Sequence, residues 1–268
     1  MIAIRFHYVV LSALAMWADP SVGRATDRVL TCRFELHNPG PVATDAVLSL
    51  AVPEMARVAI QPSRKGAGGG RGTHCFRIPA IAPSGTHILS VEVRLPSGRE
   101  PFALKEAVAD HLKPSRFIES DNLEIVGLAV SLHGDSPGRT AAELCSWVHR
   151  EIHYSGFRSE ASGAAEVLSS RRGDCSEMAF LLAALCRAAG IPARVMGGYI
   201  VRQDCVLKPH EYHNWAEFHD GTAWRVADPQ RNTFMEEEDA YVAFEICDGS
   251  RAWSRFKVEG EGVTARMF

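Results

Sequence analysis

The chain has 268 residues, of which 46% are hydrophobic and 23% are charged, a composition that excludes an intrinsically disordered protein. Its length is sufficient for one large or two modest domains with a buried core. With 29 basic and 32 acidic residues the formal net charge is −3, which lacks the positive excess typical of nucleic-acid binding. We therefore expect a folded protein with no nucleic-acid partner.

The N-terminus has the layout of a secretory signal peptide over residues 1–25. Arg5 precedes an apolar run from Tyr8 to Ala18, and the small residues Gly23 and Ala25 stand before a possible cleavage point. We expect export to the periplasm or the cell exterior, with no integral membrane segment after removal of the signal. A cytoplasmic protein with an N-terminal helix is the alternative.

Residues 26–97 show the period of two that is typical of strands with one buried face. Apolar residues alternate with polar ones over 30–36, 46–52 and 89–95, and Pro/Gly turns separate these segments. Short strands of this kind predict a small antiparallel β-sandwich.

Seven cysteines are present, an odd number, so an exported protein would keep at least one thiol free. Cys32 lies on an apolar strand face, where a buried thiol is expected, and a Cys32–Cys75 disulfide is the alternative in an oxidising compartment. No two cysteines have CxxC spacing, which gives no support to a zinc ribbon or a thioredoxin site.

Residues 98–135 are expected to be a connector with some helical potential, and from Thr140 the apolar period becomes helical. The segment Cys175–Ala189 is apolar on nearly all sides and predicts a buried central helix, which Asp174 or Ser176 can cap. Strand-like segments follow at 193–201, 213–219, 223–229 and 241–246. This order predicts an α+β domain over residues 136–268, with helices on one side of an antiparallel sheet.

Cys175 would stand at the start of that helix, where the helix dipole favours the thiolate form of a cysteine. Between the strands 213–219 and 223–229, Asp220-Gly221 predicts a two-residue type I′ turn. That register places His213 directly across from Asp228, whose carboxylate could then orient the imidazole. The sequence thus supplies a thiol, a base and a group that holds the base, in the order Cys, His, Asp.

The segments "GDCSEMAFLLAALCRAAGIPARVMGGYIV" and "HNWAEFHDGTAWRVADP" resemble the core of the transglutaminase-like superfamily. The resemblance covers roughly residues 140–230, and the upstream β-sandwich is similar to that of many bacterial members. It implies a papain-like fold in which a helix bearing the cysteine packs against an antiparallel sheet. It also implies that Cys175 is the nucleophile, His213 the general base and acid, and Asp228 the orienting carboxylate.

The activity implied by this resemblance is acyl transfer on amide or peptide bonds of a protein or peptide substrate, through a thioester. Hydrolysis by a cysteine peptidase or amidase is the simplest form. A protein cross-linking or deamidating transglutaminase is one alternative, and a non-enzymatic binding or assembly module with a vestigial papain-like fold is another.

Three further residues are expected at the substrate site. Trp215 and Glu217 share the strand face of His213 and would wall the site, and Tyr154 is a candidate for substrate binding and for a second oxyanion donor. Packing roles are the alternatives for Trp215 and Tyr154.

A metal site is a weaker alternative. His210 and His213 are one residue short of the zinc helix signature, although Cys205 lies nearby in sequence. No calcium-loop pattern is present, so we expect no metal and no cofactor.

Overall fold

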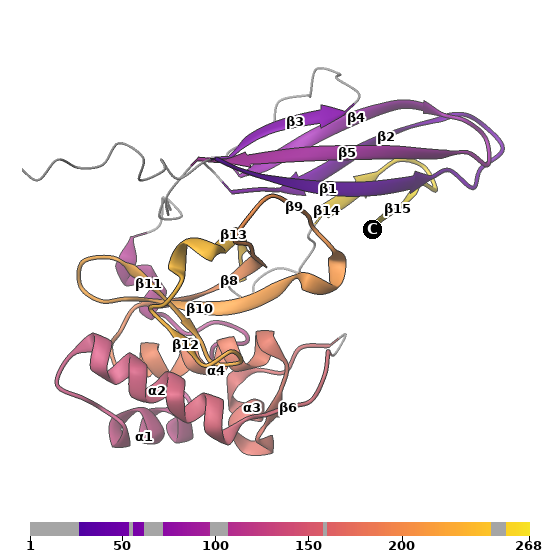
Figure 1. Ribbon diagram of the computed structural model, residues 1–268. Coiled ribbons are helices and arrows are strands. Elements are labelled where there is room, and N and C mark those ends of the chain that lie inside the picture. The colour runs from indigo at the N-terminus through magenta and orange to yellow at the C-terminus, as the bar shows by residue number, and fades with distance from the viewer. Residues whose placement is uncertain (1–26, 54–55, 62–71, 97–106, 158–159, 248–255) are drawn as a thin grey trace, which may run out of the picture.

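A computed structural model describes residues 27–53, 56–61, 72–96, 107–157, 160–247 and 256–268. The expected signal peptide, residues 1–25, lies outside the described residues. Figure 1 shows three layers, with a β-sandwich on one side, a second antiparallel sheet in the middle and helices covering the far face of that sheet.

The sandwich consists of two antiparallel sheets that enclose one apolar core. One sheet has the order β15-β1-β5-β3, with a short strand β9 beside β1, and the other has the order β14-β2-β4. Its strands are β1 (Arg28–His37), β2 (Thr44–Ala51), β3 (Arg57–Gln61), β4 (Thr73–Ile81), β5 (Thr86–Leu95), β9 (Cys205–Val206), β14 (Phe256–Glu259) and β15 (Thr264–Met267). The alternating residues on β1, β2 and β5 are buried as their period predicts, because every second side chain points inward.

The two C-terminal strands belong to the sandwich by their pairing. β14 pairs with β2 and β15 pairs with β1, both antiparallel. The sequence-based division assigned all of residues 136–268 to the second domain, whereas the structure pairs β14 and β15 with strands of the sandwich. Their return was not visible in sequence because it depends on pairing partners more than 200 residues away.

The structure has no Cys32–Cys75 disulfide; both thiols are free. Cys32 is buried on the inner face of β1. Cys75 precedes the buried Phe76 on β4, so its side chain points to the opposite, outer face. There its sulfur lies 3.4 Å from the hydroxyl of Ser49. Since one side chain points into the sandwich and the other away from it, a bridge between these positions is not formed.

The second part of the chain combines helices with a five-stranded sheet of order β12-β11-β10-β8-β13. Its sheet strands are β8 (Ala193–Ile200), β10 (His213–His219), β11 (Trp224–Asp228), β12 (Thr233–Phe234) and β13 (Tyr241–Ile246). Its α-helices are α1 (Leu123–Ser131), α2 (Pro137–Glu151), α3 (Ala164–Ser170) and α4 (Cys175–Ala188). Short elements are η1 (Val108–Leu112), β6 (His153–Tyr154), β7 (Arg172–Gly173), η2 (Pro209–Glu211) and η3 (Glu238–Ala240).

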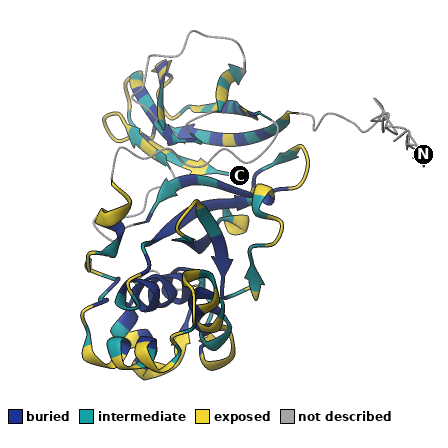
Figure 2. Ribbon diagram, turned by 90° about the vertical axis from the view of Figure 1, so that its left-hand side faces the viewer, coloured by how far each residue is buried: buried dark blue, intermediate teal, exposed yellow. Residues whose placement is uncertain are grey.

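Helix α4 forms the centre of this part, as its apolar sequence predicts. All residues from Ser176 to Arg187 are buried, and α1, α2, α3 and the sheet surround the helix (Figure 2). The expected connector contributes to the same core, because Ile118, Ile125 and Ala129 are fully buried in it. The α+β fold, with a cysteine-bearing helix against an antiparallel sheet, is therefore the one expected.

The sheet and the sandwich pack directly against each other. Tyr199 and Val242, on β8 and β13, join the apolar core of the sandwich, and β9 adds to the edge of β1 through parallel pairing of Cys205 with Leu30. The segment between β8 and β10 is therefore held against the sandwich. Among the described residues, the helices are too short or too polar to cross a membrane.

Candidate active site

Cys175 is the first residue of α4, and a capping box fixes this helix start. A carboxylate oxygen of Asp174 accepts hydrogen bonds from the backbone N–H groups of Ser176 at 2.8 Å and Glu177 at 3.3 Å. The carboxylate of Glu177 in turn accepts from the backbone N–H of Asp174 at 2.9 Å. These reciprocal bonds satisfy helix-start donors that are buried here, and so they hold the thiol at the helix N-terminus.

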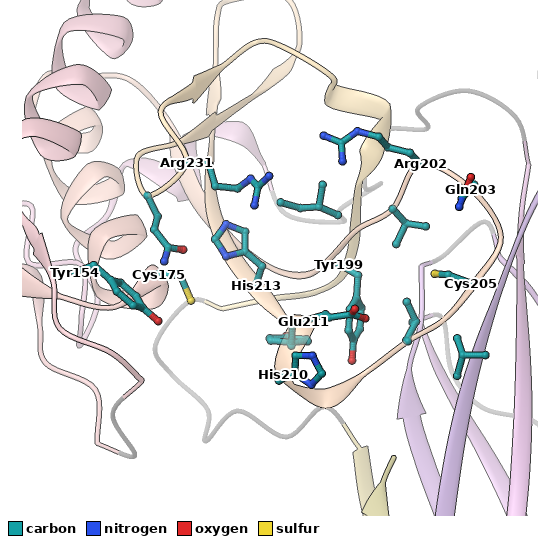
Figure 3. Close-up of a pocket in the computed structure, with 16 residues that line it drawn as sticks. Tyr154, Cys175, Tyr199, Arg202, Gln203, Cys205, His210, Glu211, His213 and Arg231 are labelled. Carbon is teal, nitrogen blue, oxygen red and sulfur yellow. The ribbon is translucent and has the colours of Figure 1, made fainter.

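Tyr154 lies close to this helix start because β6 pairs in parallel with β7. The pairing sets Tyr154 beside Gly173, two residues before Cys175. Its side chain is 58% exposed, which excludes the core-packing role that was its alternative. Tyr154 and Cys175 line the same pocket (Figure 3).

The hairpin that carries His213 is wider than the type I′ turn predicted at Asp220-Gly221. His219 pairs with Trp224, so residues 220–223 form the loop. The carboxylate of Asp220 accepts from the backbone N–H groups of Thr222 at 2.7 Å and Ala223 at 2.8 Å. These hydrogen bonds favour a four-residue loop over the two-residue turn. The longer loop shifts the pairing register of β10 and β11 by two residues.

His213 and Asp228 nevertheless meet. With the shifted register they are diagonal neighbours rather than direct partners, and residues two apart on a strand share a face. Nε2 of His213 lies 2.7 Å from Oδ2 of Asp228, and both side chains are buried. The predicted contact is present although the predicted register is wrong.

The surroundings of His213 favour its protonated form. Burial acts to lower the pKa of this imidazole, but hydrogen bonds with Asp228 and Cys175, together with the charges of these groups, raise it to about 9. An imidazole with this pKa is protonated at neutral pH, and an imidazolium stabilises a neighbouring thiolate. The structure thus joins His213 to Asp228 by a hydrogen bond and sets Cys175 close enough to raise the pKa of the same imidazole.

Asp228 has two further hydrogen-bond donors that sequence reasoning missed. The hydroxyl of Tyr241 lies 3.0 Å from Oδ2, and the backbone N–H of Arg231 lies 3.2 Å from Oδ1. Tyr241 comes from β13, on the other side of β8 and β10 from β11, so no local sequence signal connects it to Asp228. The carboxylate is completely buried and held by three groups from three segments.

Trp215 and Glu217 do not wall the pocket, which corrects the expectation for them. Glu217 forms a buried ion pair with Arg194, with Oε2 2.6 Å from Nη2, and the Arg194 guanidinium lies 4.1 Å from the ring centre of Trp224. Trp215 is completely buried and stacks on His213, with ring centroids 6.4 Å apart. Both residues share the strand face of His213, but this face is buried from His213 to Glu217, and of the three only His213 lines the pocket.

The pocket has a volume of about 540 Å³ and extends from Cys175 and His213 toward the segment that is held against the sandwich (Figure 3). Its lining includes residues 199–203, 205–207 and 210–212, which run from the end of β8 through β9 to η2. Gln230 and Arg231 complete the wall beyond Asp228. One end of the pocket therefore presents a thiol and an imidazole, and the remainder offers room for a substrate.

The alternative of a metal site also concerns this pocket, because Cys205, His210 and His213 all line it. They are not gathered into a ligand set. Within the described ranges, no three His, Cys, Asp or Glu side chains are grouped so that they could hold a metal ion.

Two kinds of comparison with known proteins gave matches. Residues 127–229 match the family model described as the transglutaminase-like superfamily. A candidate cysteine protease from Cytophaga hutchinsonii has a similar structure, with a TM-score of 0.55 and 17% sequence identity over 89% of this chain and 90% of that one. The periplasmic domain of TgpA from Pseudomonas aeruginosa gives a TM-score of 0.42 and 18% identity over 75% of this chain and 88% of that one. No curated protein matches the sequence significantly.

The likeness to the Cytophaga protein covers the sandwich as well as the helices and the second sheet, and it shows the fold. The family match is narrower and contains Cys175, His213 and Asp228. Over residues 127–229, the chain is therefore similar to the transglutaminase-like superfamily.

Proposed function

We propose that the protein is an enzyme that uses Cys175 for acyl transfer on amide or peptide bonds, with hydrolysis of a protein or peptide substrate as the reaction. The observation that carries the proposal is the placement of Cys175 in one pocket with His213, which is hydrogen-bonded to the buried Asp228. A thiol at a helix start, a base and a buried carboxylate that orients the base are the components of nucleophilic catalysis.

In the first step the thiolate of Cys175 attacks the amide carbonyl carbon, and a C–S bond forms. His213, protonated at this stage, gives its proton to the departing amine as the C–N bond breaks, which leaves a thioester. In the second step the neutral imidazole takes a proton from water, which attacks the thioester and releases the acid and the thiolate. Asp228 stabilises the imidazolium and fixes its orientation throughout.

The oxyanion that forms in each step needs hydrogen-bond donors. The backbone N–H of Cys175 is the proposed first donor, since the cap carboxylate of Asp174 takes those of Ser176 and Glu177 instead. The hydroxyl of Tyr154, on the pocket wall beside the helix start, is the proposed second donor.

Cross-linking and deamidation would use the same residues, with a glutamine side chain as the acyl donor and an amine or water as the acceptor. The pocket is not an enclosed cavity, which supports access by water, and we therefore place hydrolysis first. We also propose that the enzyme acts outside the cytoplasm, on the basis of the N-terminal sequence pattern.

The test is the rate of alkylation of Cys175 by iodoacetamide as a function of pH, followed by mass spectrometry of the Cys175 peptide. Cys75, half-buried in the sandwich, is an internal reference thiol. We expect Cys175 to react well below the pH at which Cys75 does, and His213→Ala to slow its reaction at pH 7 at least tenfold, within the range typical of a lost base. His74→Ala, on β4, is the matched control.

Equal pH profiles for Cys175 and Cys75, with no effect of His213→Ala, would mean that the thiol is not activated. The protein would then be better described as a binding or assembly module. A peptide library screened for cleavage, with Cys175→Ala as the blank, would separate hydrolysis from amine incorporation.

A further inference from the structure

The charged side chains around the pocket are unevenly distributed. Arg231 lies close to His213, Arg202 lies farther from Cys175 and near Gln203, and Glu211 lies beside His210 (Figure 3). Of these charged side chains, Arg231 lies nearest to His213.

Most of these charges already have a partner. Arg202 forms a two-pronged ion pair with Glu237 on the surface. Glu211 accepts a hydrogen bond of 3.1 Å from the backbone N–H of Lys208 within its own turn. Both groups are thus engaged in local structure.

Arg231 differs from them. Its guanidinium forms no ion pair with another residue in the described part of the chain, and its longer-range interaction is with Glu237, the carboxylate already bound to Arg202. The ion pair of Glu237 is with Arg202, and Arg231 acts on this carboxylate only through a weaker charge interaction. Glu236 and Asp239, from the same acidic run, are exposed and do not line the pocket. The charge of Arg231 is left available to a ligand.

The backbone of Arg231 is fixed relative to the reacting groups. Its N–H donates to Asp228, whose other oxygen binds His213. A guanidinium attached at this point lies on the pocket wall next to the imidazole, and its planar fork of N–H donors matches a carboxylate.

We infer that the pocket binds an acyl donor with a carboxylate next to the scissile amide, and that Arg231 recognises this carboxylate. The inference rests on the proposed function, because it concerns the substrate of the same site. In a peptide the carboxylate can belong to an acidic side chain or to the chain terminus, and both present the same chemistry to Arg231.

The test uses pairs of alkylating probes that differ only in charge. In each probe the thiolate of Cys175 displaces iodide, so that a C–S bond forms and the C–I bond breaks. N-iodoacetyl-glycine and its neutral amide represent a terminal carboxylate. N-iodoacetyl-aspartic acid α-amide and the corresponding asparagine compound represent a side chain. The measured quantity is the ratio of the two rate constants within each pair.

We expect the wild-type protein to prefer the anionic member of at least one pair by about fivefold at low salt, the ratio that corresponds to a partly exposed ion pair. Arg231→Gln should reduce that ratio to near one, and Arg231→Glu should invert it. Arg33→Gln removes an exposed charge from β1 and should leave the ratio as it is. The pair that shows the effect identifies the source of the carboxylate.

A ratio near one for both pairs in the wild-type protein would overturn the inference. A preference that persists in Arg231→Gln and Arg231→Glu would also overturn it, since the His213 imidazolium would then be its cause. Failure of the proposed function has a different signature. Iodoacetamide, which is neutral, would then label Cys175 no faster than Cys75, whatever the ratio within the charged pairs.

Discussion

The hydroxyl of Tyr241 lies 3.0 Å from Oδ2 of Asp228, the same carboxylate oxygen that binds His213. Burial, and then the charge of Asp228, raises the pKa of Tyr241, so the phenol stays protonated and donates to the carboxylate. Strand β13 therefore helps to position the carboxylate that positions the imidazole.

Tyr241→Phe should remove this donor and retain the packing of the ring against Trp215. We expect the free energy of unfolding to fall by about 1 kcal/mol, as for a typical lost hydrogen bond. The pKa of His213, followed by NMR, should rise, because a carboxylate with one donor fewer is a stronger base. Phe244→Leu, also on β13, should lower stability without moving this pKa. An unchanged or lower pKa in Tyr241→Phe would contradict the assigned role.

Asp228→Asn should lower the pKa of His213 below its ordinary value of about 6.5. Burial by itself lowers this pKa, and the bond to the Asp228 carboxylate is a main reason that it is raised instead to about 9. We propose NMR titration in a Cys175→Ala background, which removes the coupled thiol. A pKa that stays above 6.5 in Cys175→Ala/Asp228→Asn would show that Asp228 is not the cause.

The same variants should also differ in how their free energy of unfolding depends on pH. The pKa of His213 is higher in the folded than in the unfolded chain, so its stabilising effect is complete below about pH 6.5 and is lost as the pH rises through the folded pKa. Urea denaturation of Cys175→Ala should therefore show a decline in stability that begins above about pH 6.5, since Asp228 still raises the pKa of His213 in this variant. The decline should be absent when Asp228 is also replaced by Asn.

Glu217→Gln should act on stability rather than on substrate binding. It leaves the guanidinium of Arg194, with 1% of its side chain exposed, without its carboxylate partner. Breaking a buried pair of this kind costs about 3–5 kcal/mol. We expect a large shift in the urea midpoint, with recovery in the double variant Arg194→Met/Glu217→Leu. A normal urea midpoint combined with a raised KM would contradict this role and indicate that Glu217 contributes to substrate binding.

Asp174→Ala should weaken the start of α4. Loss of an N-cap costs about 1–2 kcal/mol, and here the cap also orders the residue next to Cys175. We expect both a lower urea midpoint and slower alkylation of Cys175 by iodoacetamide at pH 7. Ser136→Ala removes the N-cap of α2 and is the matched control, because it should lower stability without slowing the alkylation.

Gly198→Ala should disrupt the sheet beneath His213. Gly198 pairs with His213 on one side and with Ala243 on the other, and a Cβ atom there would lie 2.0 Å from the carbonyl oxygen of Val242. Backbone must move to relieve this contact, so we expect a loss of about 3 kcal/mol or more. Gly127→Ala, in α1 with open space at the Cβ position, should instead stabilise the protein by about 0.5–1 kcal/mol.

The parts of the site that could be predicted from sequence are those set by local pattern. The bounds of α4 follow from an apolar run, an acidic cap and a glycine stop, and the alternation on β10 and β11 sets His213 and Asp228 on one face. The contact between His213 and Asp228 was predicted correctly despite the wrong register of β10 and β11, because a shift of two residues keeps each side chain on the same face of the sheet. A shift of one would have separated the pair.

What sequence could not predict depends on distant partners. Tyr241 meets Asp228 across the order of the sheet, and Arg194 neutralises Glu217 from the neighbouring strand β8. Trp215 and Glu217 were expected at the substrate site because they share a face with His213. Which part of that face is open depends on elements that pack over it, and these come from elsewhere in the chain.

The return of β14 and β15 to the sandwich has a consequence for synthesis of the protein. Glu35 on β1 and Arg266 on β15 form an ion pair across 231 residues of sequence, and Figure 1 shows the C-terminal strands beside the N-terminal ones. At about 5–20 residues per second, a ribosome needs on the order of 10–50 s to make that stretch. For this interval the edges of β1 and β2 lack their final partners, and unpaired edges invite association with other chains. The protein should therefore depend on chaperones while it is being made, and loss of its last dozen residues should cause aggregation.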